Sequence, residues 1–566
     1  MTTFNDLLRG HHAANPDRTA IVLQHAGQDD QPLTYGELLS AANGYAQTYA
    51  ENGLQPGEVV VLILQHSREL VAAFWGAVLH GAIPSIMPFL TEKLSPERYR
   101  ADLVSLVSIT KPSAIVTYPE FESEVRAALT EGDSVRRVIV TDQVAPASPP
   151  DFGLLAGSRR SPADIVLLQH SSGTTGLQKG VALSHEAVIN QLTAYSQALG
   201  LDPETDVIVS WLPLYHDMGL IAAFLMPVLL GVPLVIQSPF DWVRAPYRLM
   251  QAVSKYKGTL SWLPNFAYNF SAQRVRPRDL EGVDLSSWRA VINCSEPVHF
   301  TSHQAFFEKF EPYGLKWEAL QTSYAMAENV FAVTQSPLNA TPAVEEIDRI
   351  AFIHERMIRP VTDGRPSVKM MSSGRVLSNA RVRVVDEHRR EVPERVVGEV
   401  ALRSDCMLTG YYNRPDITQK AFHDGWYLTG DYGYLSNGEL YVTGRKKDMI
   451  IVGGKNIYPQ DLEALASEVD GIHTGRTVAF GIYDERQGTE EVVIVAEADT
   501  ADPDERQRLA DEVRQHVTKN SAVALRYVHI VGPKWVIKTS SGKVARSANK
   551  EKYLEEQGIN GREETS

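Results

Sequence analysis

The segment from Ser171 to Gly180 combines residue types and a spacing that could hold a phosphate group. It follows the strand-like run 165–169 and reads Ser-Ser-Gly-Thr-Thr-Gly-Leu-Gln-Lys-Gly. Glycines permit unusual backbone angles, N–H and hydroxyl groups can converge on phosphate oxygens, and the lysine supplies positive charge. The candidate phosphate-binding residues are Ser171, Ser172, Gly173, Thr174, Thr175, Gly176 and Lys179. The spacing differs from G-x-x-x-x-G-K-[ST], so we do not expect an ordinary P-loop ATPase, and taken alone the segment is also compatible with a plain surface loop.

Further runs follow this segment in a particular order along the chain. They are SWLPLYHDMGL (210–220), TSYAMAEN (322–329), YLTGDYGYL (427–435) with VTGRKKDMIIVGGKNIYPQDLE (442–463), and KTSSGKVAR (538–546). Together with the first segment they resemble the ordered motifs of the adenylate-forming superfamily, which comprises acyl-CoA synthetases, peptide-synthetase adenylation domains and luciferases. The resemblance covers nearly the whole chain.

Within that superfamily the chain is most similar to fatty acyl-AMP ligases. The runs that carry this likeness are DLSSWRAVINCSEPV (284–298), FEPYGLKWEALQTSYAMAENVFAVTQ (310–335) and NIYPQDLE (456–463). The segment at about 335–371 looks like the ligase-type insertion, although a long surface loop is the alternative. In that family the insertion is thought to restrain the small domain and to disfavour CoA, and acyl groups pass to the phosphopantetheine of a carrier protein.

The reaction that the resemblance implies joins two anions, a carboxylate and the α-phosphate of ATP. Their repulsion must be offset by cations and oriented donors. The resemblance assigns this role to Lys543, which enters from the small domain. Glu328 and Thr174 are expected to bind Mg²⁺, because hard oxygen ligands suit a cation that bridges phosphates. His216 resembles a gate between the acyl pocket and the ATP site. A solvated lysine, a helix-capping glutamate and a buried core histidine are the alternatives.

The resemblance also implies a nucleotide pocket. Asp431 matches the aspartate that hydrogen-bonds both ribose hydroxyls, and Arg445 would reach the same ribose or a phosphate. Tyr324 is expected to stack on adenine. The remaining candidate nucleotide-binding residues are Ser295, Glu296 and Pro297 on the opposite wall, and Ser323, Ala325 and Met326 beside the tyrosine. The family usually has glycine at the position of Ala325, so a methyl group would come close to the nucleotide or the acyl channel.

Several features bear on the substrate and on the acceptor. Asp217 means that amino-acid substrates are not excluded, since an aspartate near this motif pairs with the substrate ammonium in amino-acid-activating relatives. The apolar run 220–230 and the aromatic-rich run 261–270 could line an acyl tunnel or belong to the core. Lys447 lies at the pivot of the hinge that the family uses to rotate its small domain. A basic surface for an acidic carrier protein, or an ordinary solvated face, could be formed by Lys534, Lys538, Lys543, Arg546, Lys550 and Lys552.

The elements that must position these residues alternate between helical runs and short β-branched strands, such as the run 59–65. This pattern predicts an α/β protein with mostly parallel sheets. We expect a large N-terminal adenylate-forming domain with layered sheets and helices over 1–446, and a small mobile α+β C-terminal domain over 447–566 that carries the catalytic lysine. The apolar run 219–236 is interrupted by Pro227, Gly231 and Pro233, so it predicts a buried helix, a turn and a strand and no membrane span.

Composition excludes several classes of protein. The 566 residues include 55 Lys+Arg and 69 Asp+Glu, which gives a net charge of −14, with 43% hydrophobic and 22% charged residues. Nucleic acid is therefore not expected to be the main partner. Two cysteines are too few for a disulfide framework or a four-ligand zinc site. The chain starts without a basic segment and an apolar core, so we expect a cytoplasmic protein.

These observations lead to one expected activity and two alternatives. We expect an ATP- and Mg²⁺-dependent ligase that converts a fatty or medium-chain carboxylic acid to acyl-AMP and pyrophosphate, and then acylates a carrier protein. An acyl-CoA synthetase or an amino-acid-activating enzyme would share the first half-reaction. A catalytically silent nucleotide-binding scaffold is the alternative from another class, and the presence of Lys543, Glu328, Asp431 and Lys179 argues against it.

Overall fold

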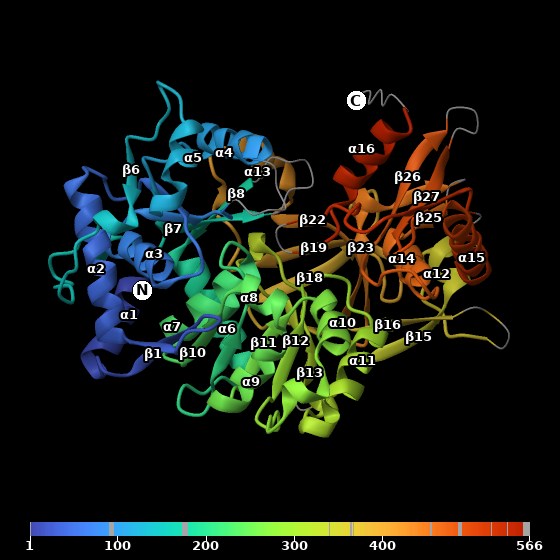
Figure 1. Ribbon diagram of the computed structural model, residues 1–566, viewed down its shortest axis with the longest axis horizontal. Coiled ribbons are helices and arrows are strands. Elements are labelled where there is room, and N and C mark those ends of the chain that lie inside the picture. The colour runs from blue at the N-terminus through green and yellow to red at the C-terminus, as the bar shows by residue number, and fades with distance from the viewer. Residues whose placement is uncertain are drawn as a thin grey trace.

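The chain folds into a large and a small lobe that lie side by side (Figure 1). The large lobe is blue to orange along the colour bar, and the small lobe is orange to red. This computed structural model describes residues 2–89, 96–171, 179–338, 340–362, 365, 367–452, 455–484, 489–521, 523, 525–539 and 542–558.

Two sheets of the large lobe are mostly parallel, as the sequence predicts. Their strands are short apolar runs such as Val59–Ile63, which is buried along its whole length because helices cover both faces of such sheets. The first sheet has the order β13-β12-β11-β9-β10-β1-β2: β1 (Thr19–Gln24), β2 (Gln31–Thr34), β9 (Ile208–Ser210), β10 (Leu234–Gln237), β11 (Leu260–Leu263), β12 (Ala290–Asn293) and β13 (Leu320–Thr322). The second has the order β20-β8-β7-β4-β3-β5-β6: β3 (Val59–Ile63), β4 (Ile83–Ile86), β5 (Ala114–Thr117), β6 (Arg137–Val140), β7 (Ile165–Ser171), β8 (Lys179–Ser184) and β20 (Gly410–Tyr411).

The third sheet of the large lobe is antiparallel, which the expectation of mostly parallel sheets did not include. The reason is visible where β22 turns into β23. Asn437 and Gly438 both have positive φ angles, 53° and 76°, which suits a two-residue hairpin. The path of this sheet is β14 (Thr334–Gln335), β17 (Arg375–Val376), β23 (Glu439–Arg445), β22 (Trp426–Ser436), β19 (Gly398–Ser404) and β18 (Ala380–Val385), and β21 (Phe422–His423) pairs with β22.

Helices pack on both parallel sheets. The helix α3 (Arg68–His80) is enclosed over most of its length; it begins after Ser67, whose hydroxyl accepts from Leu70 N–H, and ends at Gly81 in the left-handed conformation. The other helices of the large lobe are α1 (Phe4–Ala14), α2 (Tyr35–Glu51), α4 (Pro96–Thr110), α5 (Glu122–Ala127), α6 (His185–Leu199), α7 (Met226–Leu230), α8 (Pro239–Arg244), α9 (Tyr247–Tyr256), α10 (Asn265–Arg274), α11 (Phe300–Phe310) and α13 (Pro415–Ala421).

The apolar run 219–236 folds as predicted into a buried helix, a turn and a strand. A π-helical segment, η4 (Met218–Leu225), continues into α7, and the chain turns at Gly231 before β10. No helix in the described ranges is long and apolar enough to cross a membrane. Cys294 and Cys406 are both buried free thiols.

The small lobe has its own hydrophobic core. Its central sheet consists of β26 (Thr477–Asp484), β27 (Thr489–Glu497) and β28 (Tyr527–Val531). Around it lie β24 (Ile450–Val452), β25 (Lys455–Ile457), α14 (Pro459–Ser467), α15 (Pro503–Ser521) and α16 (Arg546–Glu556). The core cluster of this lobe begins at Ile450 and is separate from the main core of the large lobe. The α/β class with a small α+β lobe is therefore confirmed.

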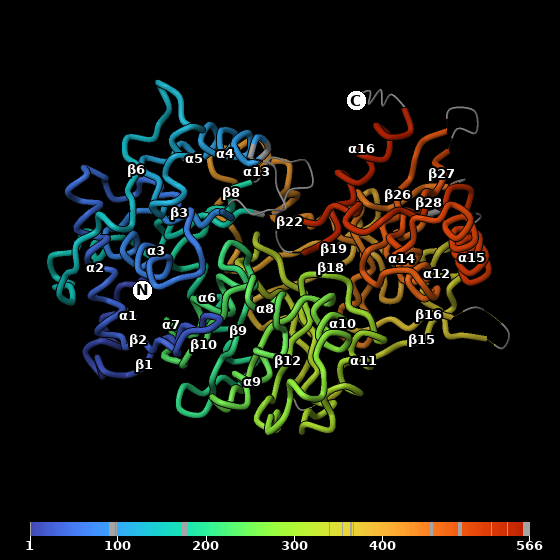
Figure 2. Tube along the Cα trace, in the orientation of Figure 1, coloured from blue at the N-terminus to red at the C-terminus, as the bar shows by residue number. Residues whose placement is uncertain are grey.

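The segment expected to be an insertion forms an ordered element between the lobes. It contains β15 (Val344–Asp348), α12 (Arg349–Glu355) and β16 (Ser367–Met371), in which β15 and β16 pair antiparallel. The tube view (Figure 2) shows α12 beside α14 and α15 of the small lobe. On the large-lobe side, Lys369 Nζ lies 4.7 Å from the ring centroid of Phe300 in α11. The segment therefore packs against both lobes.

Candidate active site

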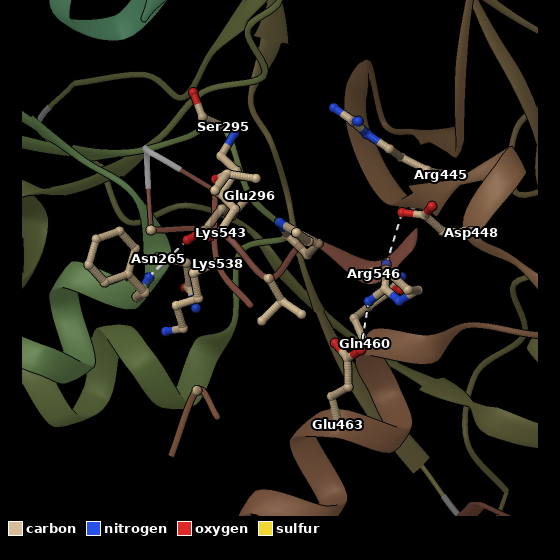
Figure 3. Close-up of a pocket in the computed structure, with 18 of the residues that line it drawn as sticks. Asn265, Ser295, Glu296, Arg445, Asp448, Gln460, Glu463, Lys538, Lys543 and Arg546 are labelled. Carbon is tan, nitrogen blue, oxygen red and sulfur yellow. Dashed lines mark hydrogen bonds and ion pairs between the residues drawn. The ribbon is translucent and has the colours of Figure 1, made fainter. Parts of the chain in front are cut away.

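A cavity of about 920 Å³ lies between the two lobes. Figure 3 shows Lys543 beside Glu296 in this cavity, with Arg445 and Asp448 on the other side. The sequence-predicted residues that line it are Ser295, Glu296, Pro297, Ser323, Tyr324, Ala325, Asp431, Arg445 and Lys543. Residues from three of the ordered motifs, and the segment Ser295 to Pro297, thus meet in one cavity.

Lys543 belongs to a tight turn of the small lobe. Thr539 N–H donates to Lys543 O at 2.7 Å, and Gly542 N–H donates to Thr539 O at 2.9 Å. Gly542 has a φ of +87°, and a Cβ at this position would lie 3.1 Å from the ring of Phe266 in the large lobe. Lys538 Nζ is 5.9 Å from the centroid of the same ring. The turn therefore packs against Phe266, and glycine allows the close approach.

The charge of Lys543 acts on two residues of the HDMG run. Burial lowers the pKa of His216 to about 3, and the positive charge of Lys543 acts in the same direction, so the imidazole is neutral at pH 7. Burial raises the pKa of Asp217, and Lys543 opposes that rise. His216 Nε2 is buried without a hydrogen-bond partner in the part of the chain that the structure describes.

Asp431 and Arg445 face each other across the β22–β23 pair. Their Cα atoms are register partners, and Arg445 Nε lies 3.6 Å from Asp431 Oδ1. Tyr324 Oη donates to Asp431 Oδ2 at 2.6 Å. Burial raises the pKa of Asp431, whereas Arg445 and the tyrosine bond oppose the rise. The carboxylate is thus held by a cation and a neutral donor at the cavity wall.

Ser295 to Pro297 form a second part of the wall. Ser295 has a φ of 68°, in the left-handed region that favours glycine. After this turn, a carboxylate oxygen of Glu296 accepts from Phe266 N–H at 3.0 Å, in the first turn of α10. A negative charge is favourable at a helix N-terminus. Glu296 therefore also stabilises the helix that presents Phe266 to the lysine turn.

Glu328 lies in η8 (Ala327–Asn329), and Tyr411 contacts both Glu328 and the phosphate-binding candidate Lys179. Tyr411 Oη donates to Glu328 Oε1 at 2.8 Å and lies 2.9 Å from Tyr427 Oη. Lys179 Nζ is 5.0 Å from the centroid of the Tyr411 ring. Burial raises the pKa of Glu328, and the hydrogen bond from Tyr411 opposes the rise. Neither Tyr411 nor Tyr427 was among the candidates from the sequence. The only feature of the sequence that could have drawn attention to Tyr411 is the pair of adjacent tyrosines after Gly410.

The predicted hinge runs through η9 (Lys446–Asp448). Lys446 Nζ pairs with Glu399 at 2.9 Å. Burial and the charge of Arg445 lower the pKa of Lys447, and the charge of Lys179 lowers it further. Asp448 pairs with Arg546 at 2.9 Å, and the same guanidinium contacts Glu463 at 2.7 Å, as the dashed lines in Figure 3 show.

The structure modifies the expected basic surface of the small lobe. Lys538, Lys543 and Arg546 line the cavity, and Arg546 carries two ion pairs. A carrier-docking face made of the whole set stays a prediction, and three of its six charges line the cavity. Sequence spacing could not distinguish these residues from Lys534, Lys550 and Lys552.

The other sequence candidates fall into two groups. Five candidates lie next to the cavity-lining residues and are not part of the described lining: His216, Met326, Glu328, Lys179 and Lys447. Five candidates of the predicted phosphate loop lie outside the described residues: Ser172, Gly173, Thr174, Thr175 and Gly176. The remaining one before them, Ser171, is the last residue of β7. The predicted phosphate loop, with Thr174 as a metal ligand, stays a prediction.

One end of the cavity is lined by apolar side chains. Four of them, Met87, Phe89, Leu103 and Phe240, lie in no run that the sequence marked, and the fifth is Phe266. Of the two runs considered for an acyl tunnel, 220–230 is core, with residues 220–229 all buried and absent from the described lining. The run 261–270 divides: Asn265, Phe266 and Asn269 line the cavity, whereas its first three residues are buried in the core.

Comparison with known proteins agrees with this arrangement. A family model described as AMP-binding enzyme matches residues 8–412. The chain is 32% identical over 583 residues to the long-chain-fatty-acid–AMP ligase FadD26 of Mycobacterium bovis, covering 97% of this chain and 96% of the relative. A structure from a study of fatty acyl-adenylate ligases of E. coli and L. pneumophila superposes with a TM-score of 0.89 at 28% identity, over 99% and 98% of the two chains. A fatty acyl-adenylate ligase of L. pneumophila in complex with acyl adenylate and pyrophosphate gives a TM-score of 0.73 at 26% identity, over 98% and 96%.

Proposed function

The chain belongs to the AMP-binding, adenylate-forming enzymes, and from that premise we propose that it activates a fatty or medium-chain carboxylic acid to acyl-AMP and then acylates a carrier protein. The observation that carries the proposal is the meeting of Lys543 from the small lobe with Tyr324 and Asp431 from the large lobe in one cavity. The apolar end formed by Met87, Phe89 and Leu103 supports an acyl chain as the substrate.

The proposed roles follow from the charges around the cavity. Lys543 offsets the repulsion between the carboxylate and the α-phosphate, because a positioned cation stabilises charge where it develops. Asp431 and Arg445 hold the ribose, and Tyr324 with the wall around Glu296 holds the adenine. His216 is neutral next to Lys543, so it separates the acyl end from the nucleotide without adding charge.

The residues present fit Mg²⁺ as an ATP-borne cation. Glu328 offers a carboxylate with one neutral donor, the Tyr411 hydroxyl, on Oε1. The described residues contain no cluster of three metal-ligating side chains, which agrees with a Mg²⁺ that takes most of its ligands from water and phosphates. When bound, the ion would neutralise phosphate charge. We propose Glu328 and Thr174 as its protein ligands.

We also propose that residues 1–446 and 447–566 act as separate units with Lys447 at the pivot. The separate core of the small lobe, which begins at Ile450, supports this division. The insertion opposes rotation because it contacts the small lobe: Phe352 stacks on Tyr458 at 5.1 Å, and Arg349 donates to Asn520 O. Restrained rotation would disfavour CoA and leave a carrier-bound phosphopantetheine as the acceptor.

The test has two stages, one for each half-reaction. Acid-dependent exchange of labelled pyrophosphate into ATP is measured over fatty acids of graded length and over amino acids. We expect exchange with fatty or medium-chain acids only; exchange with amino acids alone would move the enzyme to the amino-acid-activating class, and no exchange would favour a silent scaffold. The enzyme loaded with labelled acid is then offered CoA or a phosphopantetheinylated carrier, and efficient CoA thioester formation would end the ligase proposal.

A further inference from the structure

Tyr411 lies between the two residues expected to bind the metal–phosphate end of the nucleotide. It is buried, its hydroxyl contacts Glu328, and its ring faces Lys179. Two backbone contacts bring these residues together. Tyr411 in β20 pairs with Val181 in β8, two residues after Lys179, and Leu408 N–H donates to Glu328 O at 2.8 Å.

The hydrogen bonds of this group have one possible direction. An ionised Glu328 only accepts, so the Tyr411 hydroxyl must donate to it. Tyr411 then has no proton left for Tyr427, and Tyr427 must donate to Tyr411. The chain of donors runs from Tyr427 to Tyr411 to Glu328.

The Tyr411 side chain contacts two groups of opposite charge, Lys179 through its ring and Glu328 through its hydroxyl. A lysine and a glutamate in a half-buried site would form an ion pair and cancel each other if they met. In the described part of the site, Lys179 and Glu328 are not paired; the ammonium lies 5.0 Å from the Tyr411 ring, a distance at which the ring attracts it. Both charges are therefore left for a ligand that carries a cation and an anion together.

We propose that Tyr411 is a positioning residue: its hydroxyl fixes the metal-binding carboxylate of Glu328, and its ring keeps Lys179 from neutralising that carboxylate. This inference rests on the proposed function, since it assumes that a nucleotide phosphate and its divalent cation occupy the site. It adds Tyr411, and behind it Tyr427, to the residues on which binding of the metal–nucleotide complex depends.

The test compares Tyr411→Phe, which removes only the hydroxyl, with Tyr411→Leu, which also removes the ring. Tyr412→Phe is the matched control, because no hydrogen bond of the Tyr412 hydroxyl is found among the described residues. Calorimetry measures the Kd of ATP with and without Mg²⁺, independently of turnover. Pyrophosphate exchange measures the Mg²⁺ concentration at half-maximal rate.

We expect Tyr411→Phe to raise that Mg²⁺ concentration roughly tenfold, as is typical when a partner of a metal ligand is removed. Its binding of ATP without Mg²⁺ should stay at the wild-type value. Tyr411→Leu should weaken binding of metal-free ATP as well, because Lys179 can then pair with Glu328. The control should change neither quantity.

Two results would overturn the inference. In the first, the ratio of the ATP Kd without Mg²⁺ to the ATP Kd with Mg²⁺ is the same in Tyr411→Phe as in the wild type. Even if the melting temperature of this variant fell, the hydroxyl would then have a purely structural role. The other is unchanged metal-free binding in Tyr411→Leu. If the wild-type protein itself shows no acid-dependent exchange, the proposed function fails, and the calorimetric ratio still reports on Tyr411 alone.

Discussion

Replacing Phe352 in the insertion by alanine should loosen the contact between α12 and the small lobe. The Phe352 ring is 2% exposed, and it stacks on Tyr458 with centroids 5.1 Å apart and planes 10° from parallel. It also packs in a cluster with Ile347 and Tyr434, which stay with the large lobe whatever the small lobe does. Only the part of its packing energy that involves Tyr458 depends on the lobe arrangement.

The expected change in the equilibrium between lobe arrangements follows from the share of the Phe352 packing energy that involves Tyr458. Removing a buried phenylalanine side chain costs about 3–5 kcal/mol in all, and most of this loss acts on the fold of the insertion itself. The stacking on Tyr458 contributes about 0.5–1.5 kcal/mol beyond area burial, which corresponds to a shift of roughly twofold to tenfold in the equilibrium between lobe arrangements. We therefore expect CoA thioester formation from preloaded acyl-AMP to rise by roughly twofold to tenfold.

The assay measures acyl-CoA formation and acid-dependent pyrophosphate exchange in parallel, with a melting curve to confirm folding. Ile350→Ala is the matched control, because this residue lies on the same helix and is 37% exposed. A folded Phe352→Ala enzyme with normal exchange and an unchanged preference for the carrier over CoA would refute the idea that this stacking restrains the small lobe.

Further predictions concern Lys543, Asp431 and Asp461. Lys543→Ala should lower acid-dependent pyrophosphate exchange roughly 10²–10³-fold while ATP binding and the melting temperature stay near wild type, and Lys550→Ala is its control; comparable exchange by the variant would remove the lysine from the mechanism. Asp431→Asn should raise the Kd of ATP roughly tenfold, because a charged acceptor is lost, and calorimetry with unchanged affinity would contradict the ribose role. Burial raises the pKa of Asp461 to about 7 from 3.8, so the folded state keeps a proton that the unfolded state releases, and the stability due to this group falls as pH rises from about 4 to about 7. Asp461→Asn should remove that fall in melting temperature, and parallel curves for variant and wild type would refute it.

Much of the candidate site could be predicted from short runs of sequence. The run around Lys543 predicts a turn that exposes a lysine, because glycine and small residues allow its backbone, and the turn at Gly542 has that geometry. Asp431 and Arg445 were likewise assigned from their own motifs, and the hairpin at Asn437-Gly438 then places them opposite each other. Such motifs are local, so the chemistry that needs them is visible without a fold.

Other features depended on residues that are far apart in the sequence. The contact between Tyr411 and Glu328 comes from the pairing of β20 with β8 and from the loop before β20, and no spacing in either motif indicates it. The apolar end of the cavity joins Met87, which follows β4, to Phe240 in α8 and Phe266 in α10, and only the packing of these segments around the cavity brings them together.

The sequence by itself therefore determined the family, the α/β class and most of the residues that carry charge in the site. The tertiary structure decided which of them face the cavity, as the inward turn of Lys538 and Arg546 shows, and which apolar run is core and which is wall. The physical reason is that a side chain's type is written in the sequence, whereas its neighbours depend on strand register and on how two lobes pack. A charge or an apolar run acquires its role only from those neighbours.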